Sequence, residues 1–439
     1  MLFLLACQTL ESPSVHQHGS AQTDFFSTIE TTVGELIPTV IDVHTQTSNS
    51  ASVSISVFSG QELLYTTKPS VGTQHRFILG GFSQQQEISM QLTSEEEQSG
   101  VFTQKTGSLS FQPQIFVEQS TEISGHITTV LSGEEQGIAI WSPRSDLLWA
   151  LDLSSEERRP VQAHYLPSSG LIAYNLFSND RTEPAGEIVV VNLLGEEQFR
   201  LATPWQHHAF TPIDPQTFAY LKIAVQNTDE YGPVVGDEIV IASAEEEHVL
   251  FSAWDHFSVA PTPVWDLPFY PQGKDWTHAS GLTYNAEEEL LTLSLMGIQG
   301  VLNIALDGEI EHIFGGTMLS SNAIAVVDPP LVRPHGAVWQ DQELSLFHSP
   351  NLLSRGSVLQ LTPEPTWTEH FMSDVHALAL GDIQRLSNDL TLVNFGTAGQ
   401  LKVYDSTAAQ VLHFENAIGA YFSHAKWITD LYQVAPLEQ

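Results

Sequence analysis

The stretch "KDWTHASGLTYNAEEELLTLSLMGIQGVLNIALDGEIEHIFGG", residues 274–316, decides the fold class of this chain. It consists of short apolar segments separated by polar turns such as "NAEEE" and "LDGE". Short apolar or alternating runs bounded by turn residues are typical of antiparallel β-strands. A histidine, His278, precedes the first of these strands. The stretch therefore predicts a small antiparallel sheet with a histidine at its beginning.

The same pattern recurs along the chain from about residue 116. The units begin "GHITTVLSGEEQGIAIWSP", "HYLPSSGLIAYNLFS", "HHAFTPIDPQTFAYLKIA", "HASGLTYNAEEELLTLSL", "HGAVWQDQELSLFHS" and "GDIQRLSNDLTLVNFG". Six units of about four short strands, spaced by roughly 35–70 residues, are typical of a β-propeller. The last piece, "AYFSHAKWITDLY", is expected to supply the strand that closes the ring.

Three parts are expected in the chain. Residues 1–23 read as a signal remnant and tether, residues 24–115 as a small β-sandwich, and residues 116–439 as a six-bladed β-propeller. The sandwich is predicted from alternating segments such as "TVIDVHTQT", "ASVSISVFSG" and "EISMQLTS", which carry no evident chemical constellation. The fold class is therefore all-β.

Charge and hydropathy exclude several classes of protein. The chain has 15 basic and 52 acidic residues, a net charge of -37. Such a surface repels phosphate backbones, so no nucleic-acid partner is expected. No stretch after the N-terminus is long and apolar enough for a membrane-spanning helix. An anionic substrate would need a locally positive pocket.

The only cysteine, Cys7, ends the run "MLFLLAC", which is similar to the bacterial lipobox. In that motif the cysteine carries the lipid after signal cleavage. A frayed terminus with a chance match is the alternative interpretation. The lipobox interpretation predicts a bacterial envelope protein whose membrane contact is a lipid anchor.

Histidines stand at the beginning of four units: His164, His207–His208, His278 and His335. Equivalent residues of different blades converge at one end of a propeller channel, so these imidazoles are expected to meet there. A lone histidine is usually structural, but several at one repeat position favour a site. Metal binding is one candidate chemistry, although no closely spaced ligand motif supports it. Nucleophilic catalysis by a neutral imidazole, with donors around an anionic group, is the other.

Three ordered motifs carry a family resemblance. "DWTHAS", "RPHGA" with "SRGSVLQL", and "GDIQRLSNDLTLVNFGTAG" resemble the bacterial arylsulfate sulfotransferases, over about Trp205 to Asp405. The resemblance implies a six-bladed propeller enzyme of the envelope, without a cofactor or metal. It implies transfer of a sulfuryl group from a phenolic sulfate donor to a phenol acceptor through a sulfohistidine.

The resemblance also implies roles for single residues. His335 matches the nucleophile, His278 a residue that holds the sulfuryl group or assists proton transfer, and Thr397 a hydroxyl donor. His208 matches a further channel histidine, and His207 is its alternative. Two positions depart from the family pattern, because Ser280 replaces an asparagine and Met296 an arginine.

The loss of a guanidinium at Met296 removes a charge donor. Arg333, two residues before His335, and Lys274 are the candidate replacements. Met296 and Ser280 also favour the main alternative, a non-catalytic propeller that binds a ligand or serves as a scaffold. A metal-dependent hydrolase or lyase is the third hypothesis. In the insert "AWDHFSVAPTPVWDLPFYPQ", residues 253–272, Trp254, Trp265, Phe269 and Tyr270 are expected either to cover a phenolic substrate or to pack a long loop.

Overall fold

The chain folds almost entirely into β-strands. The computed structural model describes residues 16–17, 22–95, 97–133, 135–177, 182–315, 324–325, 331–349, 354–360, 366–372, 376–377, 379–386, 389–417, 420–429 and 431. These residues include one short α-helix, α1 (Ala253–His256), and one 3-10 turn, η2 (Gly396–Ala398). None of the helices in the described part could cross a membrane. Cys7 and most of the expected tether lie outside these residues.

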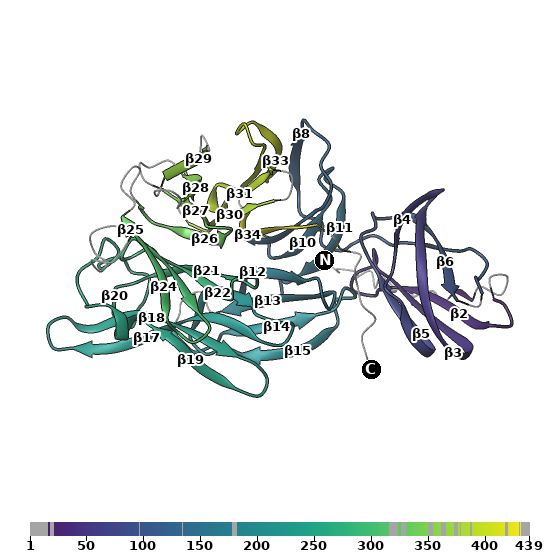
Figure 1. Ribbon diagram of the computed structural model, residues 1–439, viewed down its shortest axis with the longest axis horizontal. Helices are drawn as coiled ribbons and strands as arrows, with labels where there is room; N and C mark the ends of the chain where they lie inside the picture. Colours follow the sequence, from purple (N-terminus) through teal and green to yellow (C-terminus); the bar gives the residue numbers. More distant parts are fainter. Residues whose placement is uncertain are drawn as a thin grey trace, which may run out of the picture.

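The N-terminal domain is a sheet bent around its own core (Figure 1). Its strands are β1 (His16–Gln17), β2 (Phe26–Val33), β3 (Ile41–Ser59), β4 (Glu62–Thr66), β5 (Ser70–Leu79), β6 (Glu87–Ser94) and β7 (Phe102–Lys105). The long β3 pairs with β2 and β5 in its first half and with β4 and β6 in its second. Alternating side chains of both halves share one apolar core, as expected for a small sandwich.

One detail of this domain differs from the sequence expectation. The polar residues 48–50 were expected to separate two strands, but β3 continues through them. Their side chains are exposed, and hydrogen bonds to neighbouring strands resume at Ala51. Residues 48–50 therefore lie on the solvent side within the single strand β3, and they do not form a turn between two strands.

Six further sheets form the blades of a propeller. Blade 1 consists of β34 (Ala420–Ile428), β9 (His126–Gly133), β10 (Gly137–Trp141) and β11 (Leu147–Asp152). Blade 2 consists of β12 (Arg159–Leu166), β13 (Leu171–Phe177), β14 (Glu187–Val191) and β15 (Glu197–Ala202). Blade 3 consists of β16 (Gln206–Pro212), β17 (Phe218–Thr228), β18 (Gly232–Ala242) and β19 (Glu247–Ser252) with β20 (Lys274–Asp275). Blade 4 consists of β21 (Ala279–Asn285), β22 (Leu290–Leu295), β23 (Gly300–Ala305) and β24 (Ile310–Gly315) with β25 (Ile324–Ala325). Blade 5 consists of β26 (His335–Gln340), β27 (Glu343–His348), β28 (Arg355–Gln360) and β29 (Thr366–Met372). Blade 6 consists of β30 (Gly381–Arg385), β31 (Thr391–Phe395), β32 (Gln400–Tyr404) and β33 (Gln410–Asn416) with β8 (Ile115–Gln119).

The innermost strands form a closed ring. Each of β34, β12, β16, β21, β26 and β30 contacts the next, and β30 contacts β34 again. The C-terminal β34 completes blade 1 by pairing with β9, so the expectation that the last segment closes the ring is confirmed. At the rim, β8 pairs with β33 as a fifth strand of blade 6. The six-bladed propeller predicted from the repeat is the fold of this chain.

The second strand of each blade explains why the repeat is visible in the sequence. Strands such as β13 ("LIAYNLF") and β22 ("LLTLSL") are buried along their whole length. Both faces of a blade pack against neighbouring blades, so these strands need apolar or small residues at consecutive positions. Outer strands such as β15 ("EQFRLA") keep an alternating exposure.

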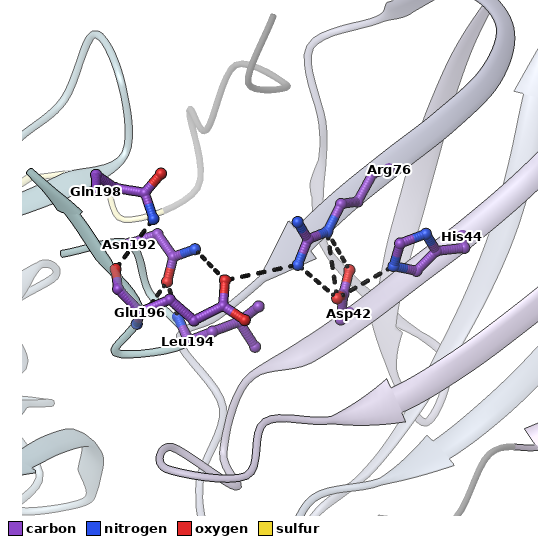
Figure 2. A network of polar contacts seen from close by, with 7 residues as sticks. All are labelled: Asp42, His44, Arg76, Asn192, Leu194, Glu196 and Gln198. Carbon is purple, nitrogen blue, oxygen red and sulfur yellow. Dashed lines mark hydrogen bonds and ion pairs between the residues drawn. The ribbon is translucent and has the colours of Figure 1, made fainter. Parts of the chain in front are cut away.

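The N-terminal domain packs against blade 2. Ile37, Val40 and Ile78 share a core with Leu193 and Leu194 of the β14–β15 turn. A polar network surrounds this contact, in which Arg76 lies 2.8 Å from Asp42 and 3.8 Å from Glu196 (Figure 2). Because strands in a blade alternate in direction, the β14–β15 turn lies at the opposite end of the blade from the start of β12. The domain therefore covers the face opposite to the one where the innermost strands begin.

Candidate active site

Bulges shape the beginnings of the innermost strands. The pairing register shifts between Gln206 and Phe210, between Ala279 and Gly281, and between His335 and Val338. The backbone near these shifts is left-handed at His208 (φ 49°), His278 (φ 44°) and Gly336 (φ 53°). Bulges redirect side chains at sheet edges. In this chain they lie where three histidines leave the plane of their blades.

These histidines line one cavity of about 520 Å³. All six blades and the insert after β19 contribute to its wall. Blades 1–3 contribute Ser132, Tyr421 and Ser423 (blade 1), Arg159, Val161 and Phe177 (blade 2) and His208 (blade 3), and the insert contributes Leu267 and Phe269. Blades 4–6 contribute His278 and Met296 (blade 4), Arg333, His335, Phe347 and Ser349 (blade 5) and Ala377, Ala379, Leu380, Gly381 and Thr397 (blade 6). The cavity lies where the innermost strands begin and the second strands end. Its walls are mostly apolar, and their polar groups include the imidazoles of His208, His278 and His335 and the side chains of Arg159, Arg333 and Thr397.

His335 is held in one tautomer by a backbone carbonyl. Its Nδ1 lies 2.6 Å from the carbonyl oxygen of Gly381. A carbonyl can only accept, so Nδ1 carries the proton and Nε2 keeps its lone pair. Burial lowers the pKa of His335 to about 4. The side chain is therefore a neutral imidazole at neutral pH, with a nucleophilic nitrogen available beside the cavity.

His278 forms a pair with a buried carboxylate. Its Nδ1 lies 2.5 Å from Oδ2 of Asp275, and the Phe269 ring packs 4.5 Å from the imidazole, centroid to centroid. Burial raises the pKa of Asp275 against the opposing effect of His278. This contact holds the imidazole ring in one orientation. His278 is thus arranged to exchange a proton with a bound molecule.

His208 belongs to a second chain of polar contacts. Its Nδ1 lies 2.8 Å from Nδ1 of His207, whose Nε2 is 3.0 Å from Oδ1 of Asp237. The hydroxyl of Tyr270 lies 3.1 Å from Nδ1 of His207. Burial alone would raise the pKa of Asp237, but contacts from His207, Thr277 and the Ala279 N–H lower it. Asp237 is therefore an anion that fixes His207, which in turn orients His208.

The cavity brings together six of the residues predicted from sequence: His335, His278, His208, Thr397, Met296 and Arg333. His207 is not among the lining residues, because it is 1% exposed behind His208. This arrangement assigns the cavity position to His208 and the supporting position to His207. The centroids of His208 and His278 are 5.0 Å apart, so two separate blades do present neighbouring imidazoles.

The structure places two of the expected residues away from the cavity wall. Ser280 was expected to bind substrate, but its buried hydroxyl donates to the carbonyl of Pro334 at 2.8 Å and is absent from the cavity wall. It fixes the segment before His335. His164 was expected beside the other histidines, but its Nε2 lies 3.0 Å from the carbonyl oxygen of Phe210 inside the channel. Burial lowers the pKa of His164 to about 3, as for a structural residue.

Sequence reasoning also missed Arg159. Arg159 pairs with Phe177, the last residue of β13, just as His335 pairs with Phe347 near the end of β27. The two residues are therefore at equivalent positions of their blades. Aligning the units on their histidines placed His164 there instead, five residues later in the chain. Arg159 could have been found by aligning the units on the end of the apolar second strand, with which the first residue of the innermost strand pairs. The histidines themselves do not mark this position.

Some aromatic residues of the insert after β19 line the cavity, and others pack the loop itself. Phe269 and Leu267 line the cavity, and Tyr270 contacts His207. Trp254 instead packs on Trp276, and Trp265 is buried against Tyr231. One side of the insert thus forms the cavity wall, whereas the other side holds the loop on blade 3. Lys274 is paired with Asp266 outside the cavity.

Metal binding finds no support in the described part of the chain, where no three His, Cys, Asp or Glu residues are placed to hold an ion. The two carboxylates near the histidines, Asp237 and Asp275, are already bound to imidazoles, hydroxyl or backbone N–H groups.

Comparison with known proteins gives distant structural matches. No protein-family model and no curated protein matches the chain. Among solved structures, a protein of unknown function from Bacteroides caccae is 12% identical over 70% of this chain and all of its own, with a TM-score of 0.41. The periplasmic gluconolactonase of Pseudomonas aeruginosa is 9% identical over 69% of this chain and 99% of its own (TM-score 0.39). A streptogramin B lyase is 12% identical over 69% and 87% (TM-score 0.38). These values carry no argument about activity.

Proposed function

We propose that this protein transfers a sulfuryl group from a phenolic sulfate ester to a phenol through a sulfohistidine on His335, without a nucleotide donor. The observation that supports the proposal most is the state of His335: a neutral imidazole whose Nδ1 proton is bound by Gly381 and whose other nitrogen lies beside a cavity. The resemblance of the "DWTHAS", "RPHGA" and "NFGTAG" motifs to arylsulfate sulfotransferases points to the same reaction.

In the first half-reaction, the lone pair on Nε2 of His335 attacks the sulfur atom of the ester. The bond between sulfur and the phenolic oxygen breaks, and its electron pair leaves with the oxygen. His278, oriented by Asp275, donates a proton to this phenolate. In the second half-reaction, His278 accepts the proton of the incoming phenol, whose oxygen attacks the sulfur and releases His335.

The alternative is a propeller of the same kind that binds a ligand without turnover. Met296 favours it, because this side chain lines the cavity where an arginine would stabilise the transferring group. A thioether cannot replace that charge. The two hypotheses differ in a measurable way, since only the enzyme releases phenol from an aryl sulfate in the presence of an acceptor.

The test is release of 4-nitrophenol from 4-nitrophenyl sulfate by the purified protein, with a phenol acceptor present. We expect turnover in the wild type and none above background in His335→Ala. The matched control is His256→Ala, whose imidazole is exposed on α1 and lies outside the cavity wall. Absence of turnover with any aryl sulfate, or full activity of His335→Ala, would reject the proposal.

The expected envelope location belongs to the same proposal and rests on Cys7 in "LLAC". Replacement of Cys7 by serine in a bacterial host is expected to abolish incorporation of labelled palmitate and to move the protein out of the membrane fraction. Equal membrane association of wild type and Cys7→Ser would contradict the lipid anchor.

A further inference from the structure

The cavity wall has an unusual charge for this chain. The protein carries 52 acidic residues, yet none of the described residues that line the cavity is an aspartate or glutamate. Two of its 15 basic residues, Arg159 and Arg333, do line it. Within the described part of the chain neither guanidinium forms an ion pair, whereas Arg76, Arg158 and Arg200 all contact carboxylates. The wall therefore offers two cations that protein carboxylates leave uncompensated.

The two arginines lie on opposite sides of the cavity. Arg159 begins β12 in blade 2, and Arg333 precedes β26 in blade 5. These blades are three steps apart in the closed ring of six, so they face each other across the axis. Arg333 has a left-handed backbone (φ 52°), which places it on the turn that leads to His335. One guanidinium thus accompanies the nucleophile and the other faces it.

Three phenylalanines contribute to the cavity wall that the two arginines share. Phe177 lies beside Arg159, Phe347 lies beside His335, and Phe269 covers His278 from the insert. Met296 adds a polarizable side chain to the same wall. Aromatic walls with a few convergent polar groups are typical of small-molecule sites. The complementary ligand has a flat apolar body and an anionic group at each end.

We infer that the cavity selects aromatic compounds with two anionic groups, one bound at Arg333 and His335 and the other at Arg159. The inference deepens the proposed function, on which the identity of the reacting end rests: the sulfate ester lies at His335 and a carboxylate or second sulfate lies at Arg159. In this arrangement Arg333 supplies the positive charge that Met296 does not.

Binding of two sulfonates tests the inference without any transfer, because their carbon–sulfur bond does not break. The ligands are 4-sulfobenzoate, with two anionic groups, and benzenesulfonate, with one, and calorimetry gives their dissociation constants. We expect the wild type to bind 4-sulfobenzoate about tenfold more tightly, as a charge-assisted hydrogen bond predicts. Arg159→Gln should bring the two ligands to similar affinity, and Arg333→Gln should weaken both.

The matched control is Arg158→Gln, since Arg158 precedes Arg159 but pairs with Glu187 outside the cavity. It should keep the tenfold preference. Equal affinity of the wild type for both ligands, no binding of either, or an unchanged preference in Arg159→Gln would overturn the inference. A preserved preference in a protein that never turns over an aryl sulfate would reject sulfuryl transfer and leave the dianionic ligand class supported.

Discussion

At His335 one hydrogen bond decides which ring nitrogen is available for chemistry. The carbonyl of Gly381 fixes the proton on Nδ1, and burial keeps the ring neutral. At His278 the neighbouring group is instead the carboxyl group of Asp275, which lies 2.5 Å from Nδ1. The two histidines of this cavity therefore have different hydrogen-bond partners, as the proposed roles of His335 as nucleophile and His278 as proton carrier require.

The low pKa of His335 predicts a pH dependence of stability. The unfolded chain binds a proton on this residue near pH 6.5, whereas the folded chain binds it only near pH 4. Between these values the unfolded state binds more protons, so acidification favours unfolding. We expect lowering the pH from 7 to 5 to cost the wild type up to about 2 kcal/mol more stability than His335→Gln.

Denaturant unfolding of both proteins at the two pH values measures this difference. A His335→Gln variant that loses as much stability as the wild type would show that His335 titrates normally in the folded protein. Other buried histidines contribute equally to both proteins and cancel in the comparison.

The residue scale is also where prediction from sequence succeeded and failed. His208, His278 and His335 could be predicted to meet, because equivalent repeat positions lie around one axis. Arg159 and Ser280 could not be assigned in this way. A bulge inserts a residue into a strand, so counting positions from a histidine does not tell which neighbour faces the channel.

At the scale of single elements, β26 depends on Gly336, the glycine after His335. Gly336 is left-handed, and a Cβ there would lie 2.6 Å from Cβ of Asp382 and 2.7 Å from the carbonyl oxygen of Gly381. That carbonyl is the one that binds His335. The close approach of β26 and β30 at this point therefore positions the imidazole of His335.

Replacement Gly336→Ala is expected to cost more than the conformational penalty alone. Gly60 has a similar φ of 60° but nothing within 4 Å of an added Cβ, so Gly60→Ala isolates that penalty of about 1–2 kcal/mol. Gly336→Ala should lose a further 1–3 kcal/mol or so from the clash. Chemical unfolding of both variants gives the values, and equal losses would contradict the close packing of β26 on β30.

The insert after β19 is expected to contribute binding of the aromatic ring. Phe269 is 37% exposed and packs on His278, so Phe269→Ala should raise KM for an aryl sulfate about fivefold to tenfold with little loss of stability. Phe116→Ala is the control, because Phe116 is 69% exposed on β8 outside this cavity. An unchanged KM in Phe269→Ala would show that the insert only packs its own loop.

Sequence patterns predict which segments are strands, but they do not predict which strands pair at the edge of a sheet. The buried second strands were recognisable as apolar runs, but the partner of an edge strand was not. β8 (Ile115–Gln119) lies at the expected domain boundary, and its largely exposed residues give no indication that it pairs with β33, about 300 positions later. Such pairings depend on the closed ring and not on local propensity.

At the scale of the whole molecule, both ends of the propeller segment close the ring. β34 supplies the innermost strand of blade 1, and β8 the outermost strand of blade 6. The N-terminal domain covers the opposite face and leaves the cavity mouth to the loops and the insert. The polar contacts of Arg76, Asp42 and Glu196 border this covered face (Figure 2).

Closure by β34 predicts that damage to this strand affects the entire propeller. Phe422 is fully buried, and Phe422→Ala should cost about 3–5 kcal/mol in a single unfolding transition of the propeller. Phe116→Ala, on the exposed rim, should change stability by less than about 1 kcal/mol. A separate early transition that leaves blades 2–6 folded would contradict closure by this strand.

The central claim, that His335 carries the transferred group, is tested most directly by the mass of the protein. Wild type and His335→Ala are exposed to 4-nitrophenyl sulfate without an acceptor, and the intact protein and its peptides are measured at mildly alkaline pH. We predict the mass of one added sulfuryl group on the peptide that contains His335 in the wild type, its absence in His335→Ala, and its loss when a phenol is added. No added mass despite turnover, or the same mass on another residue in both proteins, would contradict the claim.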